Sequence, residues 1–138
     1  MSASISTLGV ILAAASAFPI GSVWYSPAGF LKPWQKMTGT SDADMKKNFG
    51  PAMGYIAVAS LLTAYIMAHF IQYAEAYNGT SGITAGVETA LWLWLGLGVT
   101  TTIVNGAFES RSPMVMVIQA GNRLVTFVVM GLILGAFM

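Results

Sequence analysis

The chain contains no cysteine and only one histidine, and just 8% of its 138 residues are charged. Without cysteine, disulfides, thiolate metal ligands and cysteine nucleophiles are excluded. A lone histidine cannot supply the several ligands of an ordinary zinc site, and we expect no metal or other cofactor. Soluble domains carry about 25% charged residues, so this chain is poorly suited to a surface in water. A basic stripe is also missing, which argues against nucleic acid as a partner.

Hydrophobic residues are abundant instead, at 56% of the chain, and they gather in four long stretches. A membrane-spanning helix needs about 20 mostly apolar residues to cross about 30 Å of hydrocarbon, and each stretch has that length. We therefore predict a single all-α membrane domain over residues 1–138, with four transmembrane helices arranged as two antiparallel hairpins. The predicted helices run about Ser4–Trp24, Pro51–Ala74, Thr84–Ala107 and Met114–Phe137.

The first connector has the signals of a short helix of its own, at Ser41–Phe49. Ser41 is a suitable N-cap, acidic residues follow in the first turn, and lysines stand in the last turn. Gly50 is expected to end this helix, and Pro51 to open the next helix at its first position. We predict that the short helix is interfacial and lies at the membrane surface.

Positive charge predicts how the chain is oriented in the membrane. The third connector holds Arg111, whereas the second connector, residues 77–83, has no Lys or Arg. Because basic residues in short loops stay on the cytoplasmic side, connectors one and three are predicted to face the cytoplasm. Both termini then face outward, in a multi-pass protein of the cell (inner) membrane. The lysines of the first connector are Lys32, Lys36, Lys46 and Lys47.

Small residues recur at close spacing along the predicted helices. Such residues let helices approach closely in lipid, where hydrophobicity itself does not drive association. These faces either pack the helices of one chain together or join several copies, and we expect a homo-oligomer or a larger membrane complex. The small residues are Ala17 and Gly21, then Ser60, Ala64 and Ala68, then Gly96, Gly98 and Thr100–Thr102, and finally Gly131 and Gly135.

Two polar residues, His69 and Glu88, fall near the outer ends of the second and third predicted helices. The short second connector makes these helices antiparallel neighbours, which places both side chains at comparable depth. A contact between them could hold a proton, because histidine titrates near physiological pH. The alternative is that Glu88 lies among lipid headgroups and His69 bonds to a backbone carbonyl.

Arg123 lies about nine residues into the fourth predicted helix, where a charge costs about 2.5–3.5 kcal/mol on insertion scales. Arginine stays charged in such a setting. We expect it to reach toward the inner surface and meet Glu109, with Asn105 and Asn122 completing a polar network. The network either locks the third helix to the fourth or lines a polar cavity for an anionic group.

Trp24, Tyr25, Ser26 and Pro27 close the first predicted helix, and Trp34 follows in the connector. The aromatic rings among them suit the inner boundary of a membrane. The sequence resembles a bacterial membrane-protein family known as domain of unknown function 1761, which implies a four-helix membrane protein and no assigned activity. The resemblance rests on this Trp-Tyr-Ser-Pro motif, on Phe108-Glu109-Ser110-Arg111 and on Ala120-Gly121-Asn122-Arg123.

The reactive groups form no recognisable catalytic constellation, and we expect the protein not to be an enzyme. The leading interpretation is a membrane protein, surrounded by lipids, that self-associates or serves as an accessory subunit of a membrane assembly. The alternative is a small channel, or a solute or proton carrier, that uses His69, Glu88 and Arg123. A lipid-acting membrane enzyme ranks last, because the charged groups on the predicted inner face include no nucleophile.

Overall fold

The structure is a computed structural model that describes residues 5–138, and within these residues the fold is all-helical, without a β-strand. The third long helix, Gly82–Phe108, is built from three segments that follow one another without a break. The elements are α1 (Thr7–Trp24), α2 (Leu31–Thr38), α3 (Asp42–Asn78), α4 (Gly82–Leu93), the π-helical segment η1 (Trp94–Val99), α5 (Thr100–Phe108) and α6 (Pro113–Ala136).

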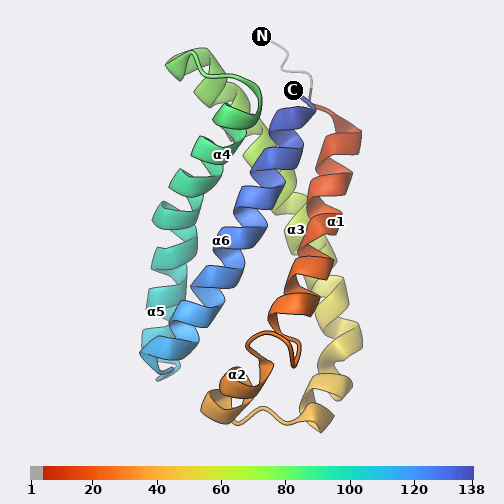
Figure 1. The fold of residues 1–138 in the computed structure, drawn as a ribbon, viewed down its shortest axis with the longest axis vertical. Coiled ribbons are helices and arrows are strands. Elements are labelled where there is room, and N and C mark those ends of the chain that lie inside the picture. The colour runs from red at the N-terminus through yellow and green to blue at the C-terminus, as the bar shows by residue number, and fades with distance from the viewer. Residues whose placement is uncertain (1–4) are drawn as a thin grey trace.

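Four helices are long and apolar enough to cross a membrane: α1, α3, the third long helix and α6. They run along the long axis of the molecule, with α2 and the start of α3 at one end (Figure 1). We call this the lysine end and the opposite one the far end, where α1 starts and α6 ends. The predicted all-α fold with four membrane-length helices is thereby confirmed. The predicted first residue, Ser4, lies outside the described residues.

α3 is one continuous helix of 37 residues, which corrects the prediction of a separate short helix at Ser41–Phe49. At 1.5 Å per residue its length is about 55 Å, well beyond the roughly 30 Å of a hydrocarbon layer. Gly50 and Pro51 lie inside the helix and do not interrupt it. A proline removes one hydrogen bond of a helix but allows turns on both sides, so the cap at Ser41 decides where α3 begins.

The first turn of α3 is held by two reciprocal hydrogen bonds between Ser41 and Asp44. The Asp44 N–H donates to Ser41 Oγ and the Ser41 N–H donates to Asp44 Oδ2, each over 3.1 Å. Hydrogen bonds from Ser41, chiefly from its backbone N–H, hold the pKa of the exposed Asp44 below its ordinary value. The negative charge also suits the positive end of the helix dipole.

Acid is therefore expected to loosen the start of α3. Because the folded pKa of Asp44 is lowered, its stabilising effect is full above the pKa of the unfolded chain and is lost as the pH falls through the folded value. The NMR shift of the Ser41 amide should titrate in this acidic range, and Asp44→Asn should remove the titration. A Ser41 amide shift that stays flat in the unsubstituted protein would contradict this assignment.

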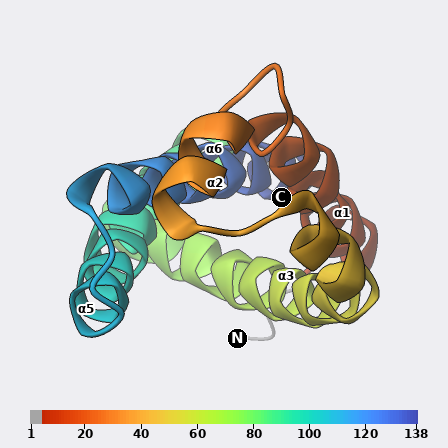
Figure 2. The ribbon, with the colours of Figure 1, turned by 90° about the horizontal axis from the view of Figure 1, so that it is seen from below.

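α2 is an amphipathic helix that the sequence analysis did not predict. It packs against α6 across the lysine end, where Figure 2 shows it in front of the bundle. Its partly buried residues recur with the spacing of one helix face, and the residues between them are exposed. The partly buried residues are Leu31, Trp34, Gln35 and Thr38, and the exposed ones are Lys32, Pro33, Lys36 and Met37.

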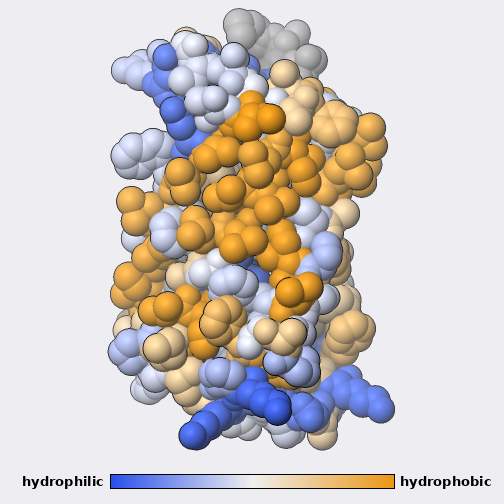
Figure 3. Space-filling model, in the orientation of Figure 1, coloured by the Kyte–Doolittle hydropathy of each residue, from blue (hydrophilic) through white to orange (hydrophobic). Residues whose placement is uncertain are grey.

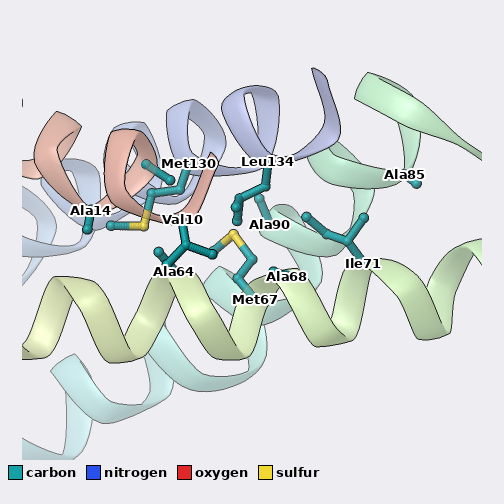
Figure 4. Packing of buried hydrophobic residues seen from close by; sticks show 11 residues of the cluster. Val10, Ala14, Ala64, Met67, Ala68, Ile71, Ala85, Ala90, Met130 and Leu134 are labelled. Atoms are coloured by element: carbon teal, nitrogen blue, oxygen red, sulfur yellow. The ribbon is translucent and has the colours of Figure 1, made fainter. Parts of the chain in front are cut away.

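The hydrophobic core lies between α1, α3, α4 and α6, toward the far end (Figure 4). Met67 and Ile71 of α3 and Met130 and Leu134 of α6 fill it with fully buried side chains. Small residues separate these larger ones and let the helices come together, as the spacing on the second predicted helix indicates. Ser60, Ala64 and Ala68 of that helix are all buried.

α4 and α6 approach most closely where glycine meets glycine. Gly86 and Gly131 face each other so closely that a Cβ on either residue would overlap the backbone of the other. One turn further, a Cβ on Gly135 would lie 2.5 Å from the carbonyl oxygen of Gly82. Gly131 and Gly135 thus pack within the chain, against a Gly82-Gly86-Ala90 spacing that the sequence analysis did not single out.

The surface matches a chain whose helices face hydrocarbon. Figure 3 shows a broad apolar region over the long helices, with hydrophilic side chains gathered at the two ends. Many large apolar side chains are exposed, among them Trp92, at 74% exposure, and Tyr55, at 78%. In water such a surface would aggregate, because contiguous apolar patches of this extent mark contact with a membrane or another protein.

Candidate functional site

The Trp-Tyr-Ser-Pro motif forms a tight turn that ends α1. The Gly29 N–H donates to Ser26 O over 2.8 Å, which closes a β-turn with Pro27 at its second position. Serine first, proline second and glycine fourth is the composition that a type I turn favours. Glycine is needed at position 29, since a Cβ there would lie 2.5 Å from Trp24 O. We call Trp24–Phe30 the motif turn.

Trp24 attaches the motif turn to α6. Its indole N–H donates to Ile118 O over 2.9 Å. Its ring lies over Gly121, where a Cβ would come within 2.8 Å of Trp24 Cζ2, and it also packs on Phe30 with centroids 4.7 Å apart. Because a carbonyl oxygen has two lone pairs, Ile118 O can accept this bond in addition to its helical one. The contact depends on the absence of a side chain at Gly121.

A second tryptophan reaches the same stretch of α6 from the third long helix. Trp94 is the first residue of η1, and its indole N–H donates to Ala120 O over 2.8 Å. Gly98 lies beside this ring, and a Cβ added to Gly98 would be 3.3 Å from Trp94 Cδ1. π-Helical turns are rare and often occur at functional sites. Two indoles from two helices therefore fix the segment of α6 just before Asn122 and Arg123.

Tyr25 and Trp34 extend this contact to α2. Their rings meet edge to face, with centroids 5.5 Å apart and an interplanar angle of 64°. Burial raises the pKa of Tyr25, which follows the end of α1, and the nearby positive charge of Arg123 opposes that rise. Arg123 itself is exposed and makes no ion pair or hydrogen bond with any residue in the range 5–138.

Two buried donors of this region lack an acceptor among the described residues: the indole N–H of Trp34 and the side-chain amide nitrogen of Asn122. A buried donor without a partner costs about 1–3 kcal/mol, so such groups are uncommon in a finished structure. Both are donors, as is the guanidinium of Arg123. One of the two, Asn122, directly precedes Arg123 on α6, and the other, Trp34, is joined to the motif turn through Tyr25.

The predicted contact between Arg123 and Glu109 does not form in the described part of the chain. Glu109 pairs instead with Arg111, with 3.4 Å between Arg111 Nε and Glu109 Oε2, and Asn105 is exposed on α5. The reason is distance along α6: Arg123 lies ten residues after Pro113, or about 15 Å from the start of the helix. Arg111, two residues from Glu109 in the tight connector, reaches it first.

His69 and Glu88 are also not joined by an ion pair anywhere in residues 5–138. His69 is partly buried and packs edge to face on Tyr65 of its own helix, with centroids 4.7 Å apart. Glu88 is exposed, because its neighbours Thr89 and Ala90 take the buried face of α4. The antiparallel neighbours predicted from the short connector therefore turn these two side chains in different directions.

Two shallow hollows on the surface do not contain His69, Glu88 or Arg123. One, of about 350 Å³, is an apolar groove between α1 and α6, and the other, of about 230 Å³, lies on the outer face of α5. Within residues 5–138, no three His, Asp or Glu side chains come together as a metal site would require. The groove is lined by Pro19, Ile20, Val23, Trp24 and Val125, and the α5 hollow by Thr100, Thr101, Val104 and Asn105.

The model of a family described as protein of unknown function, DUF1761, matches residues 8–135. The chain belongs to the DUF1761 family. No curated protein and no solved structure matches it. For this DUF1761 protein, the structure gives the motif a role: the Trp-Tyr-Ser-Pro turn binds α1 to the Ala120–Arg123 segment of α6.

Sequence reasoning missed Trp94 as part of this arrangement. The residue lies 26 positions from Ala120, so no local spacing connects the two. The one available signal is Gly98, four residues later on the same helical face, which leaves room for a large ring. Such a signal is weak by itself, because glycine is frequent in membrane helices.

Proposed function

We propose that this protein is a multi-pass membrane protein that self-associates, or joins a larger membrane assembly, through the exposed face of its third long helix. The observation that carries the proposal is the low burial of that helix. Only 11% of its most apolar stretch is buried inside the chain, against 22% to 28% for the other three membrane-length helices. It packs mainly through α4, and α5 is left open on one side.

The open face combines a small residue with polar ones. Gly96 has nothing within 4 Å of a Cβ built on it, so another helix can approach there. Thr101 and Asn105 are exposed, and their side chains have no hydrogen-bond partner among the described residues, while the Thr100 hydroxyl donates to Gly96 O over 2.7 Å. Small residues and Ser, Thr or Asn side chains are what membrane helices use to bind one another.

The lysines support an orientation with the lysine end in the cytoplasm. Exposed Lys32 and Lys36 of α2 and Lys46 and Lys47 of α3 all stand there, as does Arg111. Basic residues of short connectors remain on the cytoplasmic side, which would place both chain ends outside. The division of α2 into an exposed face with two lysines and a partly buried face with Leu31 and Trp34 supports its position at the membrane surface, in the role first assigned to residues 41–49.

Self-association should be lost when the open face is filled. We expect the unsubstituted protein to form an oligomer in mild detergent and Gly96→Leu to be mainly monomeric, because a leucine there blocks close helix approach. Native mass spectrometry and light scattering measure the mass. Gly54→Leu is the matched control, since Gly54 on α3 is likewise open, with nothing within 4 Å.

A strictly monomeric, partnerless parent protein would overturn the proposal. Equal loss of association in Gly54→Leu and Gly96→Leu would also overturn it, because the effect would then not belong to the third long helix. Asn105→Leu serves as a second probe of the same face that leaves the backbone unchanged. It should weaken association less than Gly96→Leu, since one hydrogen bond between membrane helices is worth about 0.6–2 kcal/mol.

The channel or carrier alternative gains no specific support from the geometry. Arg123 and Glu88 are exposed on the outside of the chain, and His69 contacts Tyr65. A conduction path formed between several copies of the chain would still be lined by these charged side chains. Ion or proton flux through reconstituted vesicles that disappears in Arg123→Leu would restore the alternative.

A further inference from the structure

Arg123 is a permanent positive charge for which residues 5–138 provide no counter-ion. It lies ten residues into α6, on a helix long and apolar enough to cross a membrane. Its side chain is exposed, and residues 5–138 offer it neither an ion pair nor a hydrogen bond. Because a charge is costly in hydrocarbon, an arginine of a membrane helix is normally paired or reaches the headgroups. The unpaired state of Arg123 therefore calls for a partner.

The acidic residues cannot provide that partner. The sequence has five of them, and Glu109 is already bound by Arg111. Glu75 accepts a hydrogen bond from the Gly82 N–H at the far end. In the first turn of α3, Asp42 accepts a hydrogen bond from Gln35 and Asp44 accepts one from Ser41.

Glu88, the fifth acidic residue, is on the wrong level. Gly86, two residues before Glu88, faces Gly131 on α6. Gly131 lies eight residues beyond Arg123, so Glu88 is about 12 Å from the level of Arg123 along the helix. A second copy in the same orientation would present the same five acids at the same levels. These placements favour a counter-ion that comes from a molecule other than this chain.

The chain around Arg123 is arranged for an acceptor. Trp24 rests on Gly121, two residues before Arg123, and this places Tyr25 and the rest of the motif turn beside it. The Trp34 ring leans on Tyr25, and its buried N–H has no acceptor among the described residues. The side-chain amide of Asn122 likewise holds a buried nitrogen without an acceptor.

The level and the charge of the region favour phosphate. α1 ends at Trp24, so the chain leaves the apolar layer at the height of Arg123, where lipid headgroups begin if the lysine end is at the membrane surface. Exposed Lys32 and Lys36 on the adjoining α2 add positive potential. A guanidinium fork matches phosphate oxygens in pairs, which a point charge cannot do.

We propose that Arg123, with Tyr25 beside it, binds the phosphate group of an anionic phospholipid at the lysine end. The lipid would complete the positive, donor-rich surface formed by the motif turn, α2 and α6. The Trp-Tyr-Ser-Pro motif then both joins two helices and shapes a headgroup site. This lipid site is independent of the open face of the third long helix.

The test measures lipid retained by the full chain. Protein is reconstituted in nanodiscs of phosphatidylcholine with phosphatidylglycerol, and native mass spectrometry counts the anionic lipid that stays bound. Arg123→Leu should lower phosphatidylglycerol retention about tenfold, and Arg123→Lys should fall between, because lysine keeps the charge without the fork. Lys47→Leu removes one equal charge from the lysine end and should retain the lipid like the parent.

Each remaining outcome is decisive. Equal retention in Arg123→Leu and the parent, or an equal loss in Lys47→Leu, would overturn the site in favour of diffuse attraction to lysines. Displacement of the lipid by excess inorganic phosphate would show a phosphate site supplied from solution and overturn the lipid assignment. Tyr25→Phe removes only a hydroxyl and keeps the ring on Trp34, so it should fold like the parent. A severalfold lower retention in this variant would show that the loss in the arginine variants does not come from misfolding. The oligomer mass, read from the same spectra, should not change in Arg123→Leu.

Discussion

Gly86→Leu is expected to destabilise the protein by about 3 kcal/mol or more, the upper range for overpacking a core. Even one added carbon at this position would overlap the backbone of Gly131, and backbone cannot rotate aside as a side chain does. The α4–α6 contact must therefore open along its length. The loss should appear in the free energy of unfolding during titration of detergent micelles with sodium dodecyl sulfate.

Gly54→Leu again gives the matched control, because it adds the same side chain to a helix position with nothing within 4 Å. It should change the unfolding free energy by no more than about 0.5 kcal/mol, as exposed substitutions usually do. Gly131→Leu should reproduce the loss from the other side of the contact. If Gly86→Leu were as stable as Gly54→Leu, the close packing of α4 on α6 would be disproved.

Trp24→Ala is expected to cost about 3 kcal/mol, near the lower end for removal of a large aromatic side chain, since Trp24 is only partly buried. The substitution removes the hydrogen bond to Ile118 O and the ring that covers Gly121. With the motif turn released, Tyr25 and α2 lose their support as well. Proteolysis of the first connector should become faster along with the loss of stability.

Trp24→Phe separates the two contributions of the indole. It removes the donor together with the pyrrole part of the indole, so the expected loss is at least about 1 kcal/mol, the net value of one hydrogen bond, and less than that of Trp24→Ala. Trp92→Ala removes an indole that is 74% exposed, and it should leave stability nearly unchanged. A Trp92→Ala variant that loses as much as Trp24→Ala would mean that the motif turn has no special part in joining α1 to α6.

The four long helices could be predicted from the sequence because apolar length alone defines them. The exact starts of these helices, and the position of the short helix between them, were harder to predict. Pro51 looked like a helix start, yet it lies within α3, since the capping bonds of Ser41 and Asp44 set the true beginning. The first-connector helix was placed at residues 41–49, whereas the separate helix is α2, at Leu31–Thr38, where helical spacing of apolar residues was overlooked.

The candidate site shows a similar division. The sequence drew attention to the Trp-Tyr-Ser-Pro motif and to Arg123, because aromatic clusters and charges within helices are conspicuous in an apolar chain. The residues that they contact could not be predicted from the sequence. These contacts depend on how helices far apart in the sequence pack against one another. Glu109 was matched to Arg123 on charge alone, but Arg111 is nearer and takes it.

The central claim is that the long helices cross a bilayer, with the lysine end and the second connector on opposite sides. Because the chain has no cysteine, single cysteines introduced as Lys47→Cys and Asn78→Cys are unique probes. In sealed, oriented vesicles, a membrane-impermeant maleimide should label one position from outside and the other only after the membrane is opened. Labelling of both positions from the same side would contradict the account.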